Sequence, residues 1–230
     1  MIKAVFFDID GTLIDHMSSQ RLALKEFYES RFTGFRPDYE DFLILWKSLG
    51  KKYFDMYADG KISLLDQRAR RIIDSFGEYE IVVERQDALG AFNEYLTFYK
   101  RHWRIYDDVV PTLMSLKEEY MLGIISNGGS NGQRDKLSTT DIIHFFDSIT
   151  ISEDIHVAKP NELIFKKAID SLNVRPSEAA YVGDDIKADI EGARRSGILD
   201  IYIDRVSSGY RGATFTIKTL KDLRGIINID

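Results

Sequence analysis

The sequence predicts an α/β fold in which helices cover a doubly wound, mostly parallel sheet and a separate helical domain is inserted. Two observations carry this prediction: short apolar runs alternate with helical patterns over most of the chain, and one long stretch contains helical patterns alone. The first run, residues 2–7, is apolar on both faces apart from Lys3. Such a run is typical of a strand that lies between two helical layers.

Later apolar runs predict four further strands, at residues 121–125, 148–151, 179–182 and 199–203. Helical patterns lie between the strands, at about 108–119, directly after Gly129, around 163–169 and at about 186–196. Because strands and helices alternate, right-handed crossovers and a doubly wound sheet are expected.

The stretch from residue 16 to residue 100 contains no convincing strand and repeats apolar residues at helical spacing. The repeats are Phe42, Leu45, Trp46 and Leu49, then Leu65, Ala69, Ile72 and Phe76, then Leu89, Phe92, Leu96 and Tyr99. This spacing predicts helices that each bury one face. We therefore expect residues 16–100 to form a helical bundle with its own core, inserted into an α/β domain made of residues 1–15 and 101–230.

The composition is that of an ordinary globular protein and excludes several classes of function. Of the 230 residues 44% are hydrophobic, and 31 basic against 37 acidic residues give a net charge of −6. This balance lacks the basic footprint that nucleic acid or an anionic membrane surface requires, so neither is an expected partner. The absence of cysteine excludes disulfides, thiol catalysis and Cys-ligated zinc. Because the apolar start is too short for a membrane span and is interrupted by acids, we expect a cytoplasmic protein. Its expected oligomeric state is a monomer or a homodimer.

An acidic pair follows the first predicted strand. Asp8 and Asp10 are two residues apart on an extended chain, so both carboxylates can face one site at the carboxyl end of the strand. Two such charges need a cation or a proton between them, and Mg²⁺ is the natural partner of carboxylate oxygens. Gly11 allows a sharp exit, and Thr12 can return a hydroxyl to a carboxylate. The alternative is that these residues merely end a strand and begin a turn.

Two further strand ends carry groups suited to an anion. Ser126 and Asn127 end the second strand ahead of a predicted helix, which favours an anion-receptive turn, although such residues are also common in ordinary turns. Lys159 precedes Pro160 at the start of another helix. Its ammonium group can neutralise a phosphate or a carboxylate pair, or it can be a solvated loop lysine.

The strand at 179–182 leads into a second acidic group. Asp184 lies at the carboxyl end of this strand, where open α/β sheets bind ligands. Asp185 is well placed to cap the next helix, and Asp189, about one turn further, can reach the same end of the sheet. Taken alone, this group could be only a helix start with a negative first turn.

The four strand ends together resemble the four motifs of the haloacid dehalogenase-like (HAD) hydrolase superfamily. The matching residues are Asp8-x-Asp10-Gly11-Thr12, Ser126-Asn127, Lys159-Pro160 and Gly183-Asp184-Asp185-x-x-x-Asp189. The helical insert after the first motif resembles the branch with an all-helical cap, and residues 216–223 resemble the usual ending of that branch. The resemblance implies a Rossmann-like HAD core, residues 1–15 and 101–230, and a cap domain, residues 16–100.

The resemblance also implies the chemistry of the site. Asp8 would be the nucleophile that forms an aspartyl phosphate, and Asp10 would act as general acid and then as general base. Mg²⁺ would be held by the Asp8 side chain, the Asp10 backbone carbonyl and Asp184. The phosphate-binding residues would be Thr12, Ser126, Asn127 and Lys159. Asp185 and Asp189 would support the site, through a metal-bound water or by orienting Lys159.

We therefore expect a Mg²⁺-dependent phosphatase of a small phosphorylated metabolite, such as a sugar phosphate, a nucleoside monophosphate or phosphoglycolate. Asp10 favours phosphate chemistry, because the dehalogenases of the superfamily carry a non-acidic residue there. A phosphomutase is the nearest alternative, since an aspartyl phosphate can pass to a second hydroxyl. A phospho-accepting signalling module, whose receiver domain would have no use for the helical insert, and a degenerate regulator are more remote.

Some conspicuous residues are expected to lie outside the chemistry. The four histidines show no metal-ligand spacing, and only His16, just after the first motif, could line a cleft. Lys51, Lys52, Arg68, Arg70 and Arg71 are expected on solvated helix faces of the insert, from which one could meet a substrate group.

Overall fold

The computed structural model describes residues 1–32 and 37–228. The chain forms two compact units, one made of Met1–His16 with Arg104–Asp230 and the other of Met17–Trp103. Residues 33–36, inside the predicted helical domain, and residues 229–230 lie outside the described part. Within residues 1–32 and 37–228, no helix has both the length and the apolar character needed to cross a bilayer.

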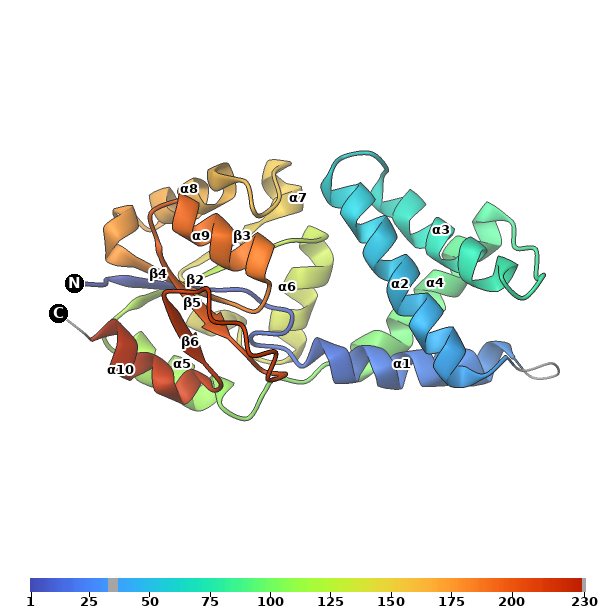
Figure 1. The fold of residues 1–230 in the computed structure, drawn as a ribbon, viewed down its shortest axis with the longest axis horizontal. Coiled ribbons are helices and arrows are strands. Elements are labelled where there is room, and N and C mark those ends of the chain that lie inside the picture. Colours follow the sequence, from blue (N-terminus) through green and yellow to red (C-terminus); the bar gives the residue numbers. More distant parts are fainter. Residues whose placement is uncertain (33–36, 229–230) are drawn as a thin grey trace. The chain divides into compact units, whose positions relative to one another are not determined.

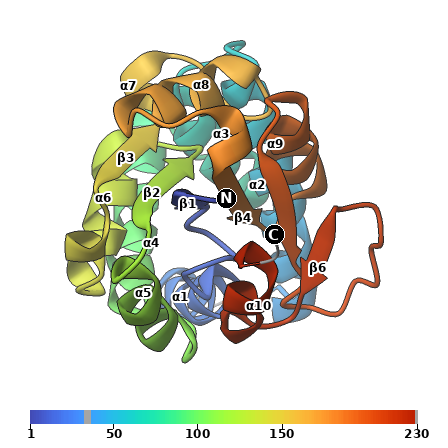
Figure 2. The same ribbon diagram turned by 90° about the vertical axis from the view of Figure 1, so that its left-hand side faces the viewer.

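The first unit contains a six-stranded parallel sheet with the strand order β3-β2-β1-β4-β5-β6 (Figure 2). The strands are β1 (Ala4–Phe7), β2 (Met121–Ser126), β3 (Ser148–Ile151), β4 (Ala179–Gly183), β5 (Leu199–Ile203) and β6 (Phe215–Ile217). This architecture confirms the predicted α/β class with a helical insertion after β1. The sequence did not predict β6, because three residues at a sheet edge, of which only Ile217 is buried, leave almost no periodic signal.

Both faces of the sheet are covered by helices, as the apolar pattern of β1 predicts. Val5 and Phe7 point into one core, which they share with Leu113 of α5 (Val109–Lys117) and Leu223 of α10 (Leu223–Ile227). Ala4 and Phe6 point into the opposite core, which includes Phe165 of α8 (Glu162–Ser171). Figure 2 shows α8 and α9 (Gly192–Arg195) on one side of the sheet and α5 and α10 on the other.

The helices of this unit are mostly short and follow the strands in turn (Figure 1). The α-helices are α5 (Val109–Lys117), α6 (Ser130–Thr139), α7 (Ser152–Ile155), α8 (Glu162–Ser171), α9 (Gly192–Arg195) and α10 (Leu223–Ile227). The 3₁₀ turns are η1 (Ile143–Phe145), η2 (Pro176–Glu178) and η4 (Leu220–Asp222). The helix predicted at about 186–196 is divided into a π-helix, η3 (Ile186–Glu191), and α9.

The described residues of the second unit form helices joined by turns, with no strand among them. Its helices are α1 (His16–Arg31), α2 (Tyr39–Ala58), α3 (Leu64–Gly77) and α4 (Arg85–Arg101), with His16 itself in the first unit. Asp38 caps α2 through the amides of Glu40 and Asp41. The core is rich in aromatic rings: Phe27, Trp46, Phe76, Phe92 and Tyr95.

The helical spacing identified most but not all of this core. Phe42 and Trp46 are fully buried as expected, whereas Leu65 is 52% exposed. Leu65 belongs to the first turn of α3, directly after the cap residue Ser63, where the helix has only begun to pack. The expectation that Arg71 lies on a solvated helix face is wrong, because its side chain is buried and only 7% exposed.

Candidate active site

Asp8 follows β1 directly and lies where the ends of β1 and β4 meet. Its amide donates to the carbonyl of Val182, 2.9 Å away, and its side chain is buried. Asp184 approaches from the end of β4 so closely that a Cβ atom on Gly11 would lie 2.1 Å from its Oδ2 atom. Gly11 also has a φ of +84°, so glycine is required here by both conformation and space.

Lys159 is the cation at the centre of the site and is 5% exposed. Its Nζ atom donates to Asp8 Oδ1 at 2.7 Å, to Asp189 Oδ1 at 2.7 Å and to the hydroxyl of Tyr181 at 2.8 Å. Burial alone would lower the pKa of Lys159, but the charges of Asp189 and Asp8 raise it above its usual value. Lys159 therefore keeps its charge and fixes the position of Asp8.

Asp8, Asp184 and Asp189 form an acidic cluster in which one oxygen of each lies within 4.8 Å of the others. Burial is the main cause that raises the pKa of Asp8 to about 7, and the negative charges of Asp189 and Asp10 add to it against the attraction of Lys159. Burial is the largest cause that raises the pKa of Asp184 well above its usual value, and the negative charge of Asp8 is the second. A hard divalent cation would relieve this repulsion, so the oxygen ligands fit a divalent metal.

The three carboxylates of the cluster are not equivalent. Both oxygens of Asp189 are already occupied, Oδ1 by Lys159 and Tyr181 and Oδ2 by the amide of Asp185 at 2.9 Å. Asp8 and Asp184 have free acceptor capacity, whereas Asp189 is committed to holding Lys159. The described structure thus offers Asp8 and Asp184 as the side chains best able to coordinate a metal.

The Asp10 carboxylate faces α6 rather than the acidic cluster. Lys136 Nζ contacts Asp10 Oδ1 at 2.6 Å and Oδ2 at 2.5 Å, and Gln133 Nε2 donates to Oδ2 at 3.1 Å. Burial would raise the pKa of Asp10, but the charges of Lys136 and His16 and the hydrogen bonds from Lys136 and Gln133 lower it to about 2. Asp10 is therefore held as a carboxylate.

Gln133 also connects Asp10 to the end of β2. Its Nε2 atom donates to Ser126 Oγ at 2.8 Å and to the Asn127 carbonyl at 2.9 Å. The Asn127 side chain contacts the Lys159 backbone, with Nδ2 to the carbonyl at 3.0 Å and the Lys159 amide to Oδ1 at 2.8 Å. The second motif, at the end of β2, and the third motif, which follows α7, are thus joined by the side-chain amide of Asn127.

Thr12 and Asp185 have other surroundings. The Thr12 hydroxyl is buried and has no hydrogen-bond partner within residues 1–32 and 37–228, while its carbonyl accepts from Arg205 at 2.8 Å. Asp185 caps η3, accepting from the amides of Lys187 at 2.9 Å and Ala188 at 2.7 Å. The helix-capping function considered for Asp185 is therefore present.

Gln133, Lys136 and Tyr181 were missed by the sequence reasoning. Gln133 and Lys136 lie three residues apart on one face of α6, so a polar pair on the helix after the Ser-Asn-Gly turn was a usable signal. Tyr181 gave none, because a tyrosine inside an apolar strand resembles ordinary core. His16 lies close enough to Asp10 for the two charges to interact, and burial lowers its pKa.

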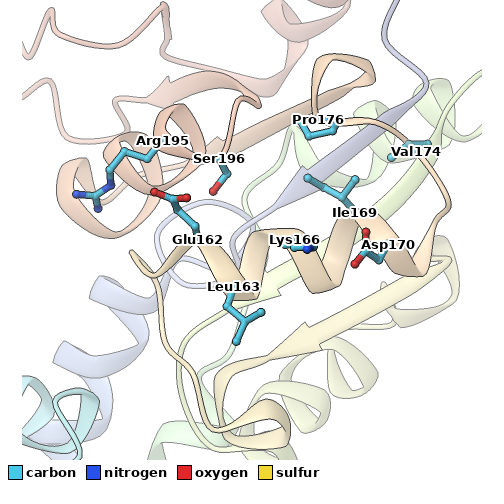
Figure 3. Close-up of a pocket in the computed structure, with 9 residues that line it drawn as sticks. All are labelled: Glu162, Leu163, Lys166, Ile169, Asp170, Val174, Pro176, Arg195 and Ser196. Atoms are coloured by element: carbon cyan, nitrogen blue, oxygen red, sulfur yellow. The ribbon is translucent and has the colours of Figure 1, made fainter.

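A cavity of about 460 Å³ lies elsewhere on the α/β unit and contains none of these residues. It is lined by residues of α8 and by Arg195, Ser196, Val174 and Pro176 (Figure 3). Lys166 and Asp170 of α8 both belong to its wall.

Comparison with known proteins agrees with the fold. Residues 2–197 match the family model of haloacid dehalogenase-like hydrolases. A glyceraldehyde 3-phosphate phosphatase from Methanopyrus kandleri is 35% identical over 210 residues, 89% of this chain and 85% of that protein. An N-acylneuraminate-9-phosphatase from Mus musculus is 28% identical over 201 residues, 86% of this chain and 80% of that protein.

The HAD-hydrolase YfnB from Bacillus subtilis, crystallised with magnesium bound, has the same fold with a TM-score of 0.84. It is 22% identical, and the match covers 99% of both chains. On the family model and the 35% identical relative, the chain belongs to the haloacid dehalogenase-like hydrolases. Helices α1–α4, which follow β1, are consistent with the helical cap of this family.

Proposed function

We propose that this chain, a phosphatase of the haloacid dehalogenase-like family, hydrolyses a small phosphorylated metabolite in a Mg²⁺-dependent reaction through an aspartyl phosphate. Two of the relatives are named as phosphoric monoester hydrolases, one of glyceraldehyde 3-phosphate and one of an N-acylneuraminate 9-phosphate. The observation that carries the proposal is the placement of Asp8, which Lys159 holds at 2.7 Å beside the carboxylate of Asp184.

Asp8 is the proposed nucleophile. Its carboxylate oxygen attacks phosphorus, the bond from phosphorus to the leaving oxygen breaks, and an acyl phosphate forms on Asp8. Lys159 fixes the Asp8 side chain from one side, so the second carboxylate oxygen remains available. Mg²⁺, held by Asp8, Asp184 and the Asp10 backbone carbonyl, would neutralise charge on the phosphoryl group.

Asp10 is the proposed acid and base. In the first step it gives a proton to the leaving oxygen, and in the second it takes a proton from the water that attacks phosphorus. The contacts with Lys136 and Gln133 favour the ionised form that accepts this proton. Donation in the first step therefore requires these contacts to weaken when substrate is bound.

The remaining predicted residues have supporting functions in this proposal. Ser126, the Asn127 amide and Thr12 bind phosphate oxygens, and Lys159 contributes a positive charge there as well. Asp189 orients Lys159, and Asp185 holds the start of η3. The insert, residues 16–100, serves as a cap that excludes water and selects the leaving group, while residues 1–15 and 101–230 perform the chemistry.

The direct test is phosphate release from p-nitrophenyl phosphate and from a panel of phosphorylated sugars, with Mg²⁺ and with a chelator. We expect turnover only with Mg²⁺, and Asp8→Asn should reduce it at least ~10³-fold because the nucleophile is lost. Asp170→Asn, which removes an exposed carboxylate of α8, is the matched control and should keep full activity. Turnover by Asp8→Asn would refute the assignment of the nucleophile.

A further inference from the structure

Arg71 of α3 is a buried cation in the core of the helical unit. Its guanidinium carbon lies 4.2 Å from the ring centroid of Trp46, 5.8 Å from that of Tyr95 and 6.0 Å from that of Phe92. The side chain is 7% exposed. Aromatic faces stabilise a guanidinium from above, but they do not satisfy the N–H donors that lie in its plane.

One of these donors lacks the partner that a buried cation normally has. Arg71 Nε is buried with no hydrogen-bond partner in the described chain. Burial, the main effect, lowers the pKa of Arg71, and the groups that raise it are the tyrosines Tyr95 and Tyr99, with no carboxylate among them. Lys136 and Lys159, the other buried cations among residues 1–32 and 37–228, each contact a carboxylate. Arg71 is therefore the exception to the rule that buried charges are paired.

The helix opposite Arg71 is shaped to receive the guanidinium. Gly50 lies inside the 20-residue helix α2, where glycine is unfavourable. A Cβ atom at position 50 would lie 2.9 Å from both Cζ and a terminal nitrogen of Arg71. Glycine thus leaves the space that the guanidinium occupies. The guanidinium lies against Gly50 and the rings of Trp46, Phe92 and Tyr95.

We infer that the helical unit carries a binding subsite for a small oxyanion, of carboxylate type, centred on Arg71. The rings of Trp46, Phe92 and Tyr95 hold the guanidinium, whose N–H donors are then preorganised for two oxygen atoms of one anion. The anion supplies the negative charge that residues 1–32 and 37–228 do not supply to Arg71. It is either a second acidic group of the phosphorylated substrate or a separate carboxylate, and the subsite itself does not depend on the reaction proposed above.

Direct binding tests the subsite without any turnover. Sodium glycerate is titrated into the full chain without Mg²⁺, against sodium chloride of equal ionic strength, while tryptophan fluorescence is recorded. Because Trp46 lies against Arg71 and Trp103 is the only other tryptophan, a saturable change is expected. Arg71→Gln should weaken binding about tenfold or more, since the paired charge is lost. The matched control Arg70→Gln, an exposed arginine of the same helix, should bind like the wild type.

A second variant separates loss of binding from loss of folding. Gly50→Ala keeps every charge but places a methyl group where the guanidinium lies, so glycerate should bind more weakly while the circular dichroism spectrum stays unchanged. The subsite is refuted if the wild type shows no saturable change, or if Arg71→Gln or Gly50→Ala, folded as judged by circular dichroism, binds as tightly as Arg70→Gln.

Kinetics identify the source of the anion. 3-Phosphoglycerate and glycerol 3-phosphate differ by a carboxylate in place of a hydroxymethyl group. If the anion belongs to the substrate, Arg71→Gln raises KM for 3-phosphoglycerate about tenfold and leaves KM for glycerol 3-phosphate unchanged. If both KM values stay unchanged while glycerate binding is lost, the ligand is a separate carboxylate. An enzyme without turnover would refute the proposed function and leave the fluorescence test intact.

Discussion

At the scale of single residues, the site is a set of carboxylates that differ in their partners. Asp8 and Asp189 share Lys159, Asp10 is paired with Lys136, and Asp184 has no ion-pair partner within residues 1–32 and 37–228. Burial raises the pKa values of Asp8 and Asp184, whereas Lys136 lowers that of Asp10 against the effect of burial, so chemically identical side chains differ in pKa. Asp184, the carboxylate without a cationic partner, is the one best suited to a metal.

Lys136 offers the sharpest test of the Asp10 assignment. Lys136→Met should lower kcat roughly 10- to 100-fold with little change in KM, because the Asp10 carboxylate loses both of its contacts to Nζ and its fixed position. Steady-state kinetics with p-nitrophenyl phosphate measure both constants. Lys166→Met, which removes an exposed lysine of α8, is the control. An unchanged kcat in Lys136→Met would show that Asp10 needs no positioning by α6.

At the scale of elements, η3 shows why a predicted helix is not regular. Asp189 lies inside this π-helix, and its side chain reaches back to the amide of Asp185 and inward to Lys159. A π-turn is wider than an α-turn, and such turns often occur at functional sites. A Cβ atom on Gly183 would lie 2.4 Å from Asp189 Cγ, so the end of β4 is open to this carboxylate. The contacts of Asp189 within the site are therefore made from a local departure from regular α-helix geometry.

Asp108 joins three segments of the α/β unit. It precedes α5 and accepts from Arg205 at 2.7 and 3.0 Å, from Thr219 Oγ1 at 2.7 Å and from the amide of Leu220 at 2.8 Å. Burial would raise the pKa of Asp108, but these hydrogen bonds and the charge of Arg205 lower it. The carboxylate therefore stabilises the folded state whenever it is ionised.

Asp108→Asn should lower the free energy of unfolding at pH 7 by about 3 kcal/mol, because Arg205 is left without its partner. Since the pKa of Asp108 is lower in the folded state, its contribution is complete above the unfolded pKa of about 4 and is lost as the pH falls below it. Urea denaturation of wild type and variant should therefore converge in acid. Asp107→Asn, an exposed neighbour, should match the wild type, and a constant difference down to pH 3 would contradict this account.

At the scale of the whole molecule, each of the two units has a core of its own. The α/β unit is built on aliphatic side chains such as Val5 and Ile124, and the helical unit on aromatic ones such as Phe27 and Trp46. The acidic cluster sits in the α/β unit, where buried carboxylates oppose folding as long as no cation is bound. Metal binding and stability are therefore coupled.

Mg²⁺ should raise the melting temperature of the wild type by about 5 °C or more at a hundredfold excess over Kd. Asp184→Asn should lose this shift and, with chelator, should melt above the wild type, because one buried charge is removed. The pKa values of Asp8, about 7, and Asp184 are raised in the folded chain, so these two carboxyl groups ionise at a lower pH in the unfolded chain. The metal-free wild type should therefore lose stability as the pH rises from about 4 to about 7.

Thermal scans by circular dichroism at pH 5 and pH 8, with Mg²⁺ and with chelator, check all three effects. Asp170→Asn should behave like the wild type in each condition. A Mg²⁺ shift retained by Asp184→Asn would exclude Asp184 as a metal ligand.

The fold and the acidic strand ends could be predicted because they depend on local patterns. Apolar residues on both faces of β1 indicate a buried parallel strand, and the two acids that follow it indicate a cation. The lysine partners could not be predicted. Lys136 belongs to α6 and meets Asp10 across 126 positions, and the exposure of a helical lysine depends on how its helix packs. For the same reason Arg71, expected in solvent, is buried.

The sequence by itself determined the α/β class, the helical insertion, and the strand ends at which acids, a hydroxyl and a lysine occur, because hydrophobic periodicity and turn chemistry act between near neighbours. Only the tertiary structure decided which cation each carboxylate receives, that Asp189 is committed to Lys159, and that Arg71 receives no carboxylate from the part of the chain that the structure describes. These pairings join residues as far apart as 151 positions, and they follow from the packing of helices on strands, to which no local pattern is sensitive.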